Sequence, residues 1–136
     1  MGMDQCLIVG NYEDIELRKC SFLHTYVGEK RKKKLGFCSC EYLTKEELRE
    51  LREKLERVKN NPQLALELLP TSKIEGCFEG INPAFTTGSL EYNSSYFYDV
   101  ERLLTFLEPL NIESLGEYDV VYSSDWFNGW KYSSFD

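Results

Sequence analysis

The sequence lacks several features that identify common classes of protein. It has no run approaching the ~18 apolar residues of a membrane-spanning helix, and residues Met1 to Gln5 lack the basic and then apolar segments of a secretion signal. The chain contains one histidine, His24. Its glycines form neither a phosphate-binding loop nor a dinucleotide-binding fingerprint, which argues against those two kinds of nucleotide chemistry. We expect a soluble protein of the cytoplasm that carries no cofactor.

The composition is that of one folded domain. A length of 136 residues matches a single domain, and 42% hydrophobic with 29% charged residues argues against intrinsic disorder. The five cysteines, an odd number without a secretion signal, are typical of free thiols in a reducing compartment. We therefore expect a single domain over residues 1–136, with an aromatic C-terminal tail over 125–136.

The formal net charge of -7 is unevenly distributed. Residues 1–74 hold 14 basic and 12 acidic groups, including the basic run from Lys30 to Lys34, whereas residues 75–136 hold 2 basic and 11 acidic groups. The negative total repels nucleic acid at long range, so direct nucleic-acid binding is not expected. The basic run is interpreted first as a solvated loop, with a contact to a phosphate or to an acidic protein as alternatives.

Local patterns predict three main helices. A cap at Asn11 and an apolar stripe favour a first helix over 12–27, closed by Gly28. Thr44 and Glu47 form a capping box, which marks the start of a second helix with apolar residues at helical spacing. That helix is expected to end at Asn60 to Pro62, where a short further helix begins.

The third main helix is expected to begin at Ser94 or Ser95 and to end before Pro109. Alternation of apolar and polar residues predicts strands, and the segment 81–93 is predicted to be a loop. The strands are expected over 35–42, 73–80 and 118–123. Together these elements predict an α+β fold in which a sheet of about three strands packs against three main helices.

Candidate functional residues are scattered rather than grouped in a motif. His24 follows Arg18 and Lys19 on the first predicted helix, where it is interpreted as structural, with an anion contact or general acid/base chemistry as alternatives. Cys38 and Cys40 lie on one side of a predicted strand, and both thiolates could reach one metal ion only if Cys20, Cys77 or His24 completed the ligands. Buried free thiols are the simpler interpretation, so neither a metal nor a catalytic residue is predicted.

The last third of the chain combines acidic and aromatic residues. Such a surface suits binding to a basic protein, because tyrosine and tryptophan often anchor protein interfaces. The residues expected to contact a protein partner are Glu91, Asp99, Glu101, Tyr122 and Asp125.

Several short motifs in order resemble a family of small, functionally uncharacterised proteins of bacteriophages and prophages. These motifs are Arg18-Lys19 followed by His24 and Val27, Leu68-Leu69-Pro70-Thr71, Gly76-Cys77-Phe78-Glu79-Gly80, Tyr96-Phe97-Tyr98-Asp99, and Tyr122-Ser123-Ser124-Asp125-Trp126. The chain departs from the family pattern at Cys77, at Glu79, at Asp125 and in the segment 81–90. The resemblance implies a phage context in a bacterial host cell and supplies no catalytic residues.

These observations lead to one hypothesis with two alternatives. The first is a phage accessory protein that counters host defence by sequestering a nucleotide-derived immune signal, either alone or as an assembly of several copies. Arg18, Lys19, His24 and part of the basic run would then contact phosphates while Tyr96, Tyr98 or Trp126 stacked on bases. The alternatives are an acidic inhibitor of a basic host protein, and a small phosphate-ester hydrolase with His24 as acid and base.

Overall fold

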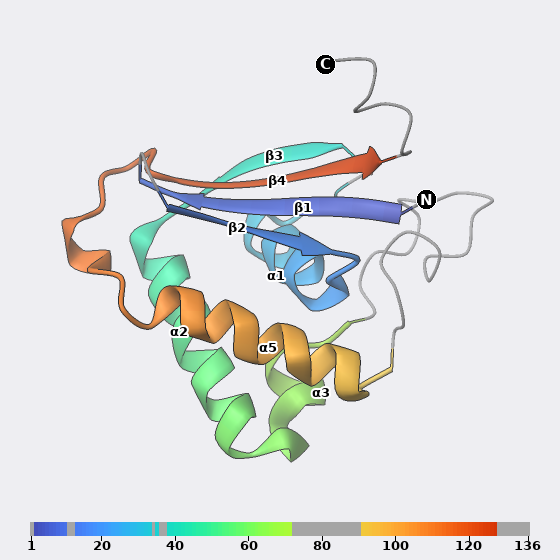
Figure 1. Cartoon of the computed structure of the whole chain (residues 1–136). Coiled ribbons are helices and arrows are strands. Elements are labelled where there is room, and N and C mark those ends of the chain that lie inside the picture. The colour runs from blue at the N-terminus through green and yellow to red at the C-terminus, as the bar shows by residue number, and fades with distance from the viewer. Residues whose placement is uncertain (1, 11–12, 34, 36–37, 72–90, 128–136) are drawn as a thin grey trace.

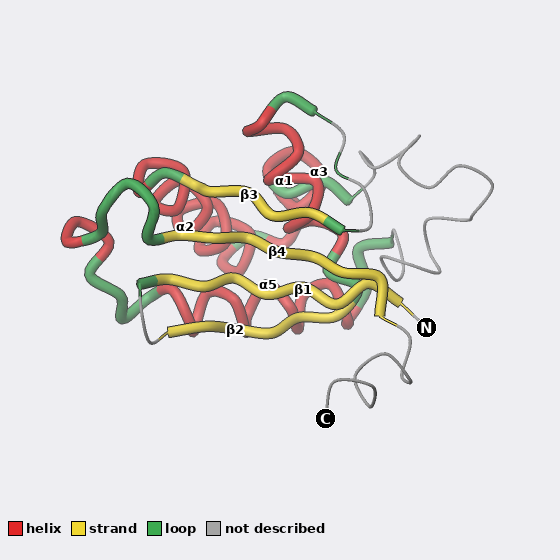
Figure 2. The backbone as a smooth tube through the Cα atoms, turned by 90° about the horizontal axis from the view of Figure 1, so that it is seen from above, coloured by secondary structure: helices red, strands yellow, loops and turns green. Residues whose placement is uncertain are grey.

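Four strands of the computed structural model form one antiparallel sheet in the order β2-β1-β4-β3. Their bounds are β1 (Gly2–Val9), β2 (Glu13–Arg18), β3 (Ser39–Leu43) and β4 (Val120–Phe127). The structure describes residues 2–10, 13–33, 35, 38–71 and 91–127. The first strand is central, because it pairs with β2 on one side and with β4, from the other end of the described chain, on the other (Figure 2).

The helices all lie on one face of this sheet (Figure 1). They are α1 (Ser21–Arg31), α2 (Lys45–Asn60), α3 (Ala65–Leu68) and α5 (Ser94–Leu107), with short 3-10 helices at Pro62–Leu64 and Ile112–Ser114. Among the described elements, no helix covers the opposite face of the sheet (Figure 1). In its described residues the chain is thus an α+β domain with one helical layer and one sheet face that no described helix covers.

The core lies between the sheet and the helices. From Asp4 to Val9 in β1, and throughout β2, every second residue is buried, including Leu7, Val9 and Leu17, because alternate side chains of a strand point to opposite faces. Facing them are side chains from the helices, and on α2 these are Leu48, Leu51, Leu55 and Val58, all fully buried. Their helical spacing was the basis for the predicted second helix, which the structure confirms.

The predicted capping box at the start of α2 is also confirmed. The Glu47 backbone N–H donates to the Thr44 hydroxyl at 3.1 Å, and the Thr44 backbone N–H donates to the Glu47 carboxylate at 2.9 Å. Two of the otherwise unpaired amides at the helix start are therefore satisfied. At the other end Asn61 follows α2 and Pro62 begins the short helix, as expected from proline's preference for a first turn.

The predicted helix over 12–27 is wrong. Residues Glu13–Arg18 form strand β2, and α1 begins only at Ser21 and continues beyond Gly28 to Arg31. Ile15 and Leu17 alternate with charged residues at period two, so both are buried in the sheet while their neighbours are exposed. Between strand and helix the backbone of Lys19 turns through a left-handed conformation with φ of 56°.

The predicted sheet was too small, because β1 and β2 were not recognised as strands. The strand predicted over 35–42 is observed as Ser39–Leu43, and the one over 118–123 as Val120–Phe127. Residues 125–127 of the predicted tail thus belong to β4, where they pair with Gly2–Asp4. The third helix is confirmed, although its cap is Asn93 rather than Ser94 or Ser95. The predicted strand 73–80, residues 81–90 of the predicted loop and residues 128–136 lie outside the described residues.

Candidate functional site

A pocket of about 220 Å³ lies where α1 and α5 begin. Arg18 and Lys19 reach it from the end of β2, since the turn at Lys19 leads directly into the N-cap residue of α1. The remaining lining comes from the first turns of the two helices and includes Ser21, Asn93, Ser95, Tyr96 and Asp99. Both helix starts lie at the same end of the molecule (Figure 1). Each contributes the partial positive charge of a helix N-terminus to a pocket that Arg18 and Lys19 also line, although the Arg18 guanidinium lies 3.8 Å from Asp4.

Asp99 is the acidic member of this pocket. Burial raises the pKa of its carboxyl above the ordinary value, while the nearby Arg102 lowers it. A carboxyl in this position accepts hydrogen bonds from hydroxyl or amino groups. The pocket therefore combines the positive charge and hydrogen-bond donors of the helix starts with one acceptor, the Asp99 carboxyl.

Tyr96 lines the same pocket but is held by the core. Its ring lies 5.1 Å from that of Phe22 and 5.0 Å from that of Tyr92, and its hydroxyl donates to the Leu69 carbonyl at 2.8 Å. Only 5% of the residue is exposed. Tyr96 can therefore form part of the wall, whereas the predicted stacking on a base is not compatible with its packing.

The other predicted aromatic ligand residues lie elsewhere. Tyr98 is 63% exposed and lines a separate depression on the outer surface of α5 together with Glu101 and Arg102, whose guanidinium carbon is 5.8 Å from the Tyr98 ring. Trp126 belongs to β4, where its backbone pairs with Met3. Of the six residues predicted to bind a ligand, Arg18, Lys19 and Tyr96 share one pocket.

His24 is part of a buried polar network rather than a ligand site. The Tyr122 hydroxyl lies 2.7 Å from His24 Nδ1, and His24 Nε2 lies 3.2 Å from the Leu35 carbonyl oxygen. Since a carbonyl only accepts, the proton belongs on Nε2, and Nδ1 accepts from the hydroxyl. Burial lowers the pKa of His24, and the Leu35 contact partly opposes that effect. His24 is therefore held neutral. Because it is fully buried, its position does not agree with the prediction that it contacts a ligand.

The same network accounts for Tyr122 and Gln5. Gln5 Nε2 donates to the Tyr122 hydroxyl and to the Cys20 carbonyl, both at 2.9 Å, and Gln5 Oε1 accepts from the Cys20 backbone N–H at 2.6 Å. The hydrogen bonds between the Gln5 side chain and the Cys20 backbone thus join β1 to the start of α1. Tyr122 is also fully buried, so its position does not agree with the prediction that it contacts a protein partner.

The remaining residues predicted to contact a partner do not form one surface. Glu91 is exposed just before α5 and Glu101 is exposed on that helix. Asp99 lines the pocket at the helix starts, whereas Asp125 lies on the open face of the sheet. The acidic and aromatic character of the last third is thus divided among several parts of the molecule.

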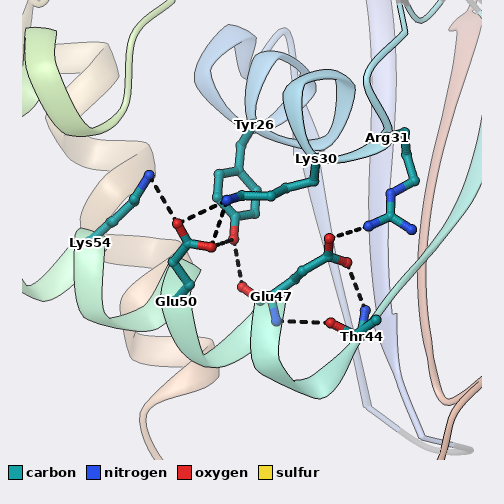
Figure 3. Close-up of polar contacts among 7 residues, drawn as sticks. All are labelled: Tyr26, Lys30, Arg31, Thr44, Glu47, Glu50 and Lys54. Atoms are coloured by element: carbon teal, nitrogen blue, oxygen red, sulfur yellow. Dashed lines mark hydrogen bonds and ion pairs between the residues drawn. The ribbon is translucent and has the colours of Figure 1, made fainter.

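The basic run is largely paired within the domain. Lys30 contacts Glu50 at 2.7 Å, and Arg31 is bonded to Glu47 (Figure 3). Lys33 contacts Glu41 at 2.8 Å. Lys30 and Arg31 form the last turn of α1, so this part of the run is not in the loop that was expected, whereas Lys32 and Lys33 follow the helix. These pairs connect the end of α1 and the residues after it to α2 and β3. Lys30, Arg31 and Lys33 are therefore engaged within the domain rather than with a ligand.

Tyr26 and Glu50 lie at the centre of this cluster (Figure 3). The Tyr26 hydroxyl donates to the Glu47 carbonyl at 2.6 Å and to Glu50 at 3.3 Å. Burial works against the charge of Glu50, but hydrogen bonds from Lys30 and Lys54 outweigh it and lower the pKa of that carboxyl. The cluster is therefore a packing contact between α1 and α2.

The cysteines are free wherever the structure describes them. Cys20 is buried on the helical side and burial raises its pKa, whereas Cys40 is exposed on β3 and Cys38 donates to Asp125 at 3.0 Å. Cys77 lies outside the described residues. In the described part of the chain, no three histidine, cysteine or acidic side chains are grouped to hold a metal ion.

A depression of about 750 Å³ on the open sheet face was missed by the sequence analysis. Its acidic residues are Asp4 and Glu16, from the strands that were not predicted, and Asp125. The signal that could have found them is the alternation of Gln5, Leu7 and Val9 with their neighbours, which is typical of a strand.

No family model, no curated protein and no solved structure matches the chain. In the described part of the chain, no helix has both the length and the apolar character needed to cross a bilayer. The resemblance to phage proteins therefore stays a prediction.

Proposed function

We propose that this chain is a binding protein that sequesters a nucleotide-derived signal, and that it holds a phosphate group of that ligand in the pocket where α1 and α5 begin. The observation that supports this proposal is the meeting of Arg18 and Lys19 with two helix N-termini in one pocket. Phosphate groups bind favourably at helix N-termini, where backbone N–H groups and the helix dipole favour negative charge. The Lys19 ammonium would add a charge-assisted hydrogen bond.

The size and polarity of the pocket define the part of the ligand that it would hold. Drug-sized ligands occupy pockets of roughly 300 Å³ or more, whereas this one measures about 220 Å³. It suits a phosphate and part of its sugar, and the base would extend beyond the rim. Asp99 would accept a hydrogen bond from a sugar hydroxyl or an amino group, and it would disfavour a second anionic group next to the first.

The biological setting is proposed from the sequence resemblance. A phage protein that removes a host immune signal would need a binding pocket and no catalytic residue. The hydrolase alternative relied on His24, which is fully buried in the Tyr122 network. The inhibitor alternative relied on one acidic aromatic surface, whose residues are divided among several sites.

The test is a ligand-release experiment with a matched pair of variants. Purified protein is incubated with separate linear, cyclic and oligomeric nucleotides, freed of unbound ligand, heated, and the released compounds are identified by mass spectrometry. Lys19 and Lys32 lie at opposite ends of α1, and both have a backbone φ of 56°. Lys19→Asn and Lys32→Asn therefore remove the same charge from the same backbone conformation, one inside the pocket and one outside it.

We expect release of an intact nucleotide from the wild type and from Lys32→Asn. Lys19→Asn should bind about tenfold more weakly, since a hydrogen bond to a charged group contributes ~1.5 kcal/mol. Equal binding by both variants would place the ligand elsewhere. Release of a chemically converted nucleotide would show that the protein is an enzyme. Release of no nucleotide would contradict the proposal.

A further inference from the structure

The pocket where α1 and α5 begin contains an acidic side chain as well as basic ones. Asp99 lines it from α5, and Arg18 and Lys19 line it from the turn that leads into α1. Two further ionisable groups in the lining are Cys20 and Tyr96, and burial raises the pKa of both, so both are uncharged at neutral pH. Among the described residues of the lining, the full charges are therefore those of Arg18, Lys19 and Asp99.

The total charge of the pocket follows from these groups. The Arg18 guanidinium lies 3.8 Å from Asp4, a carboxylate outside the lining, so the charge of Arg18 is already paired. The charges of Lys19 and Asp99 are opposite and cancel. The two helix starts add about half a positive charge each, so the pocket carries about one positive charge in all. That charge matches a single negative charge on a ligand.

Asp99 acts on the pocket as a negative charge. Burial raises the pKa of its carboxyl, and Arg102, three residues further along α5, lowers it. The Arg102 guanidinium lies outside the lining, where it donates to the Glu16 carbonyl at 3.1 Å. At pH 8, far above the ordinary pKa of 3.8, the Asp99 carboxyl is ionised. A phosphate in the pocket is therefore repelled by one carboxylate of the lining.

We propose that this pocket selects phosphodiesters over phosphomonoesters, with Asp99 as the residue that determines this specificity. The inference rests on the proposed function, since it assigns the charge of the phosphate that the pocket holds. A phosphodiester carries one negative charge, whereas a phosphomonoester carries nearly two above its second pKa of about 6. The ligand class is then a nucleotide whose bound phosphate is a diester.

The physical reason is the cost of removing the second charge from water. The attraction of a ligand to the pocket grows in proportion to its charge, whereas the cost of leaving water grows with the square of the charge and is about fourfold larger for the monoester. With about one positive charge in the pocket, the second charge of a monoester finds no partner. Replacing Asp99 by a neutral residue would supply that partner by leaving Lys19 uncompensated.

The neutral groups of the lining bind both kinds of phosphate. Ser21 and Ser95 carry hydroxyls, and the Asn93 side chain accepts from the Tyr96 backbone N–H at 3.2 Å. Hydroxyl and backbone N–H groups donate to the oxygens of a diester or of a monoester alike. The discrimination therefore depends on Asp99.

The test compares nucleoside 5′-monophosphates with their methyl esters at pH 8. The two members of a pair have the same base and sugar, and the ester has one negative charge fewer. Affinities are measured by NMR titration, in which the backbone amides at the starts of α1 and α5 report binding in the pocket. Asp99→Asn removes the charge with little change in size and keeps an acceptor. Glu101→Gln is the matched control, because it removes the same charge from an exposed position of α5 outside this pocket.

We expect the wild type to bind each methyl ester at least about fivefold more tightly than the monophosphate. The electrostatic effect of Asp99 is proportional to the ligand charge, so a gain of about fivefold for the ester in Asp99→Asn becomes about 25-fold for the monophosphate. The preference for the ester should therefore decrease about fivefold in Asp99→Asn and less than about twofold in Glu101→Gln. Thermal unfolding checks that both variants are folded, and the wild-type comparison does not depend on either variant.

Two kinds of contrary result are distinguishable. Equal or tighter binding of the monophosphate by the wild type, or an unchanged preference in Asp99→Asn, would overturn this inference, and the proposed function would stand if Lys19→Asn still weakened binding. Binding of neither member of any pair, or binding that Lys19→Asn leaves unchanged, would contradict the proposed function and this inference with it.

Discussion

Replacing Tyr122 with phenylalanine tests whether the buried polar network holds α1 against the sheet. The wild-type hydroxyl accepts from Gln5 at 2.9 Å and is 2.7 Å from His24 Nδ1. In Tyr122→Phe, Gln5 keeps both of its bonds to Cys20, so the main loss falls on the His24 ring nitrogen. Removing a partner from a buried acceptor costs about 2 kcal/mol.

For a domain of this length that cost lowers the midpoint of thermal unfolding by about 8 °C. The assay is thermal unfolding followed by circular dichroism at pH 7.5, with Tyr118→Phe as the control because Tyr118 is 66% exposed. The control should change the midpoint by less than about 1 °C. In a His24→Leu background the same Tyr122→Phe change should cost less, since the two residues are coupled. A midpoint within about 2 °C of the wild type would refute the argument.

Three further predictions concern stability. The folded-state pKa of His24 is lowered from 6.5, so the unfolded chain takes up the proton first, and the free energy of unfolding should decrease as pH falls below 6.5. A urea titration at several pH values should show that decrease in the wild type and not in His24→Gln. Asp4→Asn should raise the midpoint of thermal unfolding by 1 °C or more in calorimetry, because it relieves a repulsion of about 0.5 kcal/mol between Asp4 and Asp125. A lower midpoint would show that the lost contact between Asp4 and Arg18 has the larger effect. Thr44→Ala removes the hydroxyl of the capping box and should cost about 1 kcal/mol in urea unfolding, whereas Thr105→Ala, at an exposed position of α5, should cost much less.

The elements with strong local signals were predicted and those that depend on distant pairing were not. Helix α2 carries its own start signal at Thr44 and an apolar repeat over four turns, so no distant residue is needed to recognise it. Strand β2 has six residues, and Ile15 fits both a helical stripe and a two-residue alternation. This segment forms a strand because it pairs with β1 in the sheet. A local sequence pattern contains no information about that pairing.

The pocket could be predicted in part for the same reason. Arg18 and Lys19 stand out by charge, but their meeting with Asp99 depends on where β2 ends and where α5 begins. The burial of His24 likewise depends on Tyr122, which comes from the far end of the described chain. Spacing within a sequence gives no information on either contact.

The central position of β1 has a consequence for synthesis of the protein. Residues Gly2–Val9 leave the ribosome well before β4, yet one of the two hydrogen-bonding edges of β1 is completed only by β4. At ~10 residues per second, about ten seconds pass before Val120 emerges to meet Val9. During that time one edge of a strand with Leu7 and Val9 is open to chaperones or to a neighbouring nascent chain. Slow translation of the segment before β4 would therefore favour aggregation over folding.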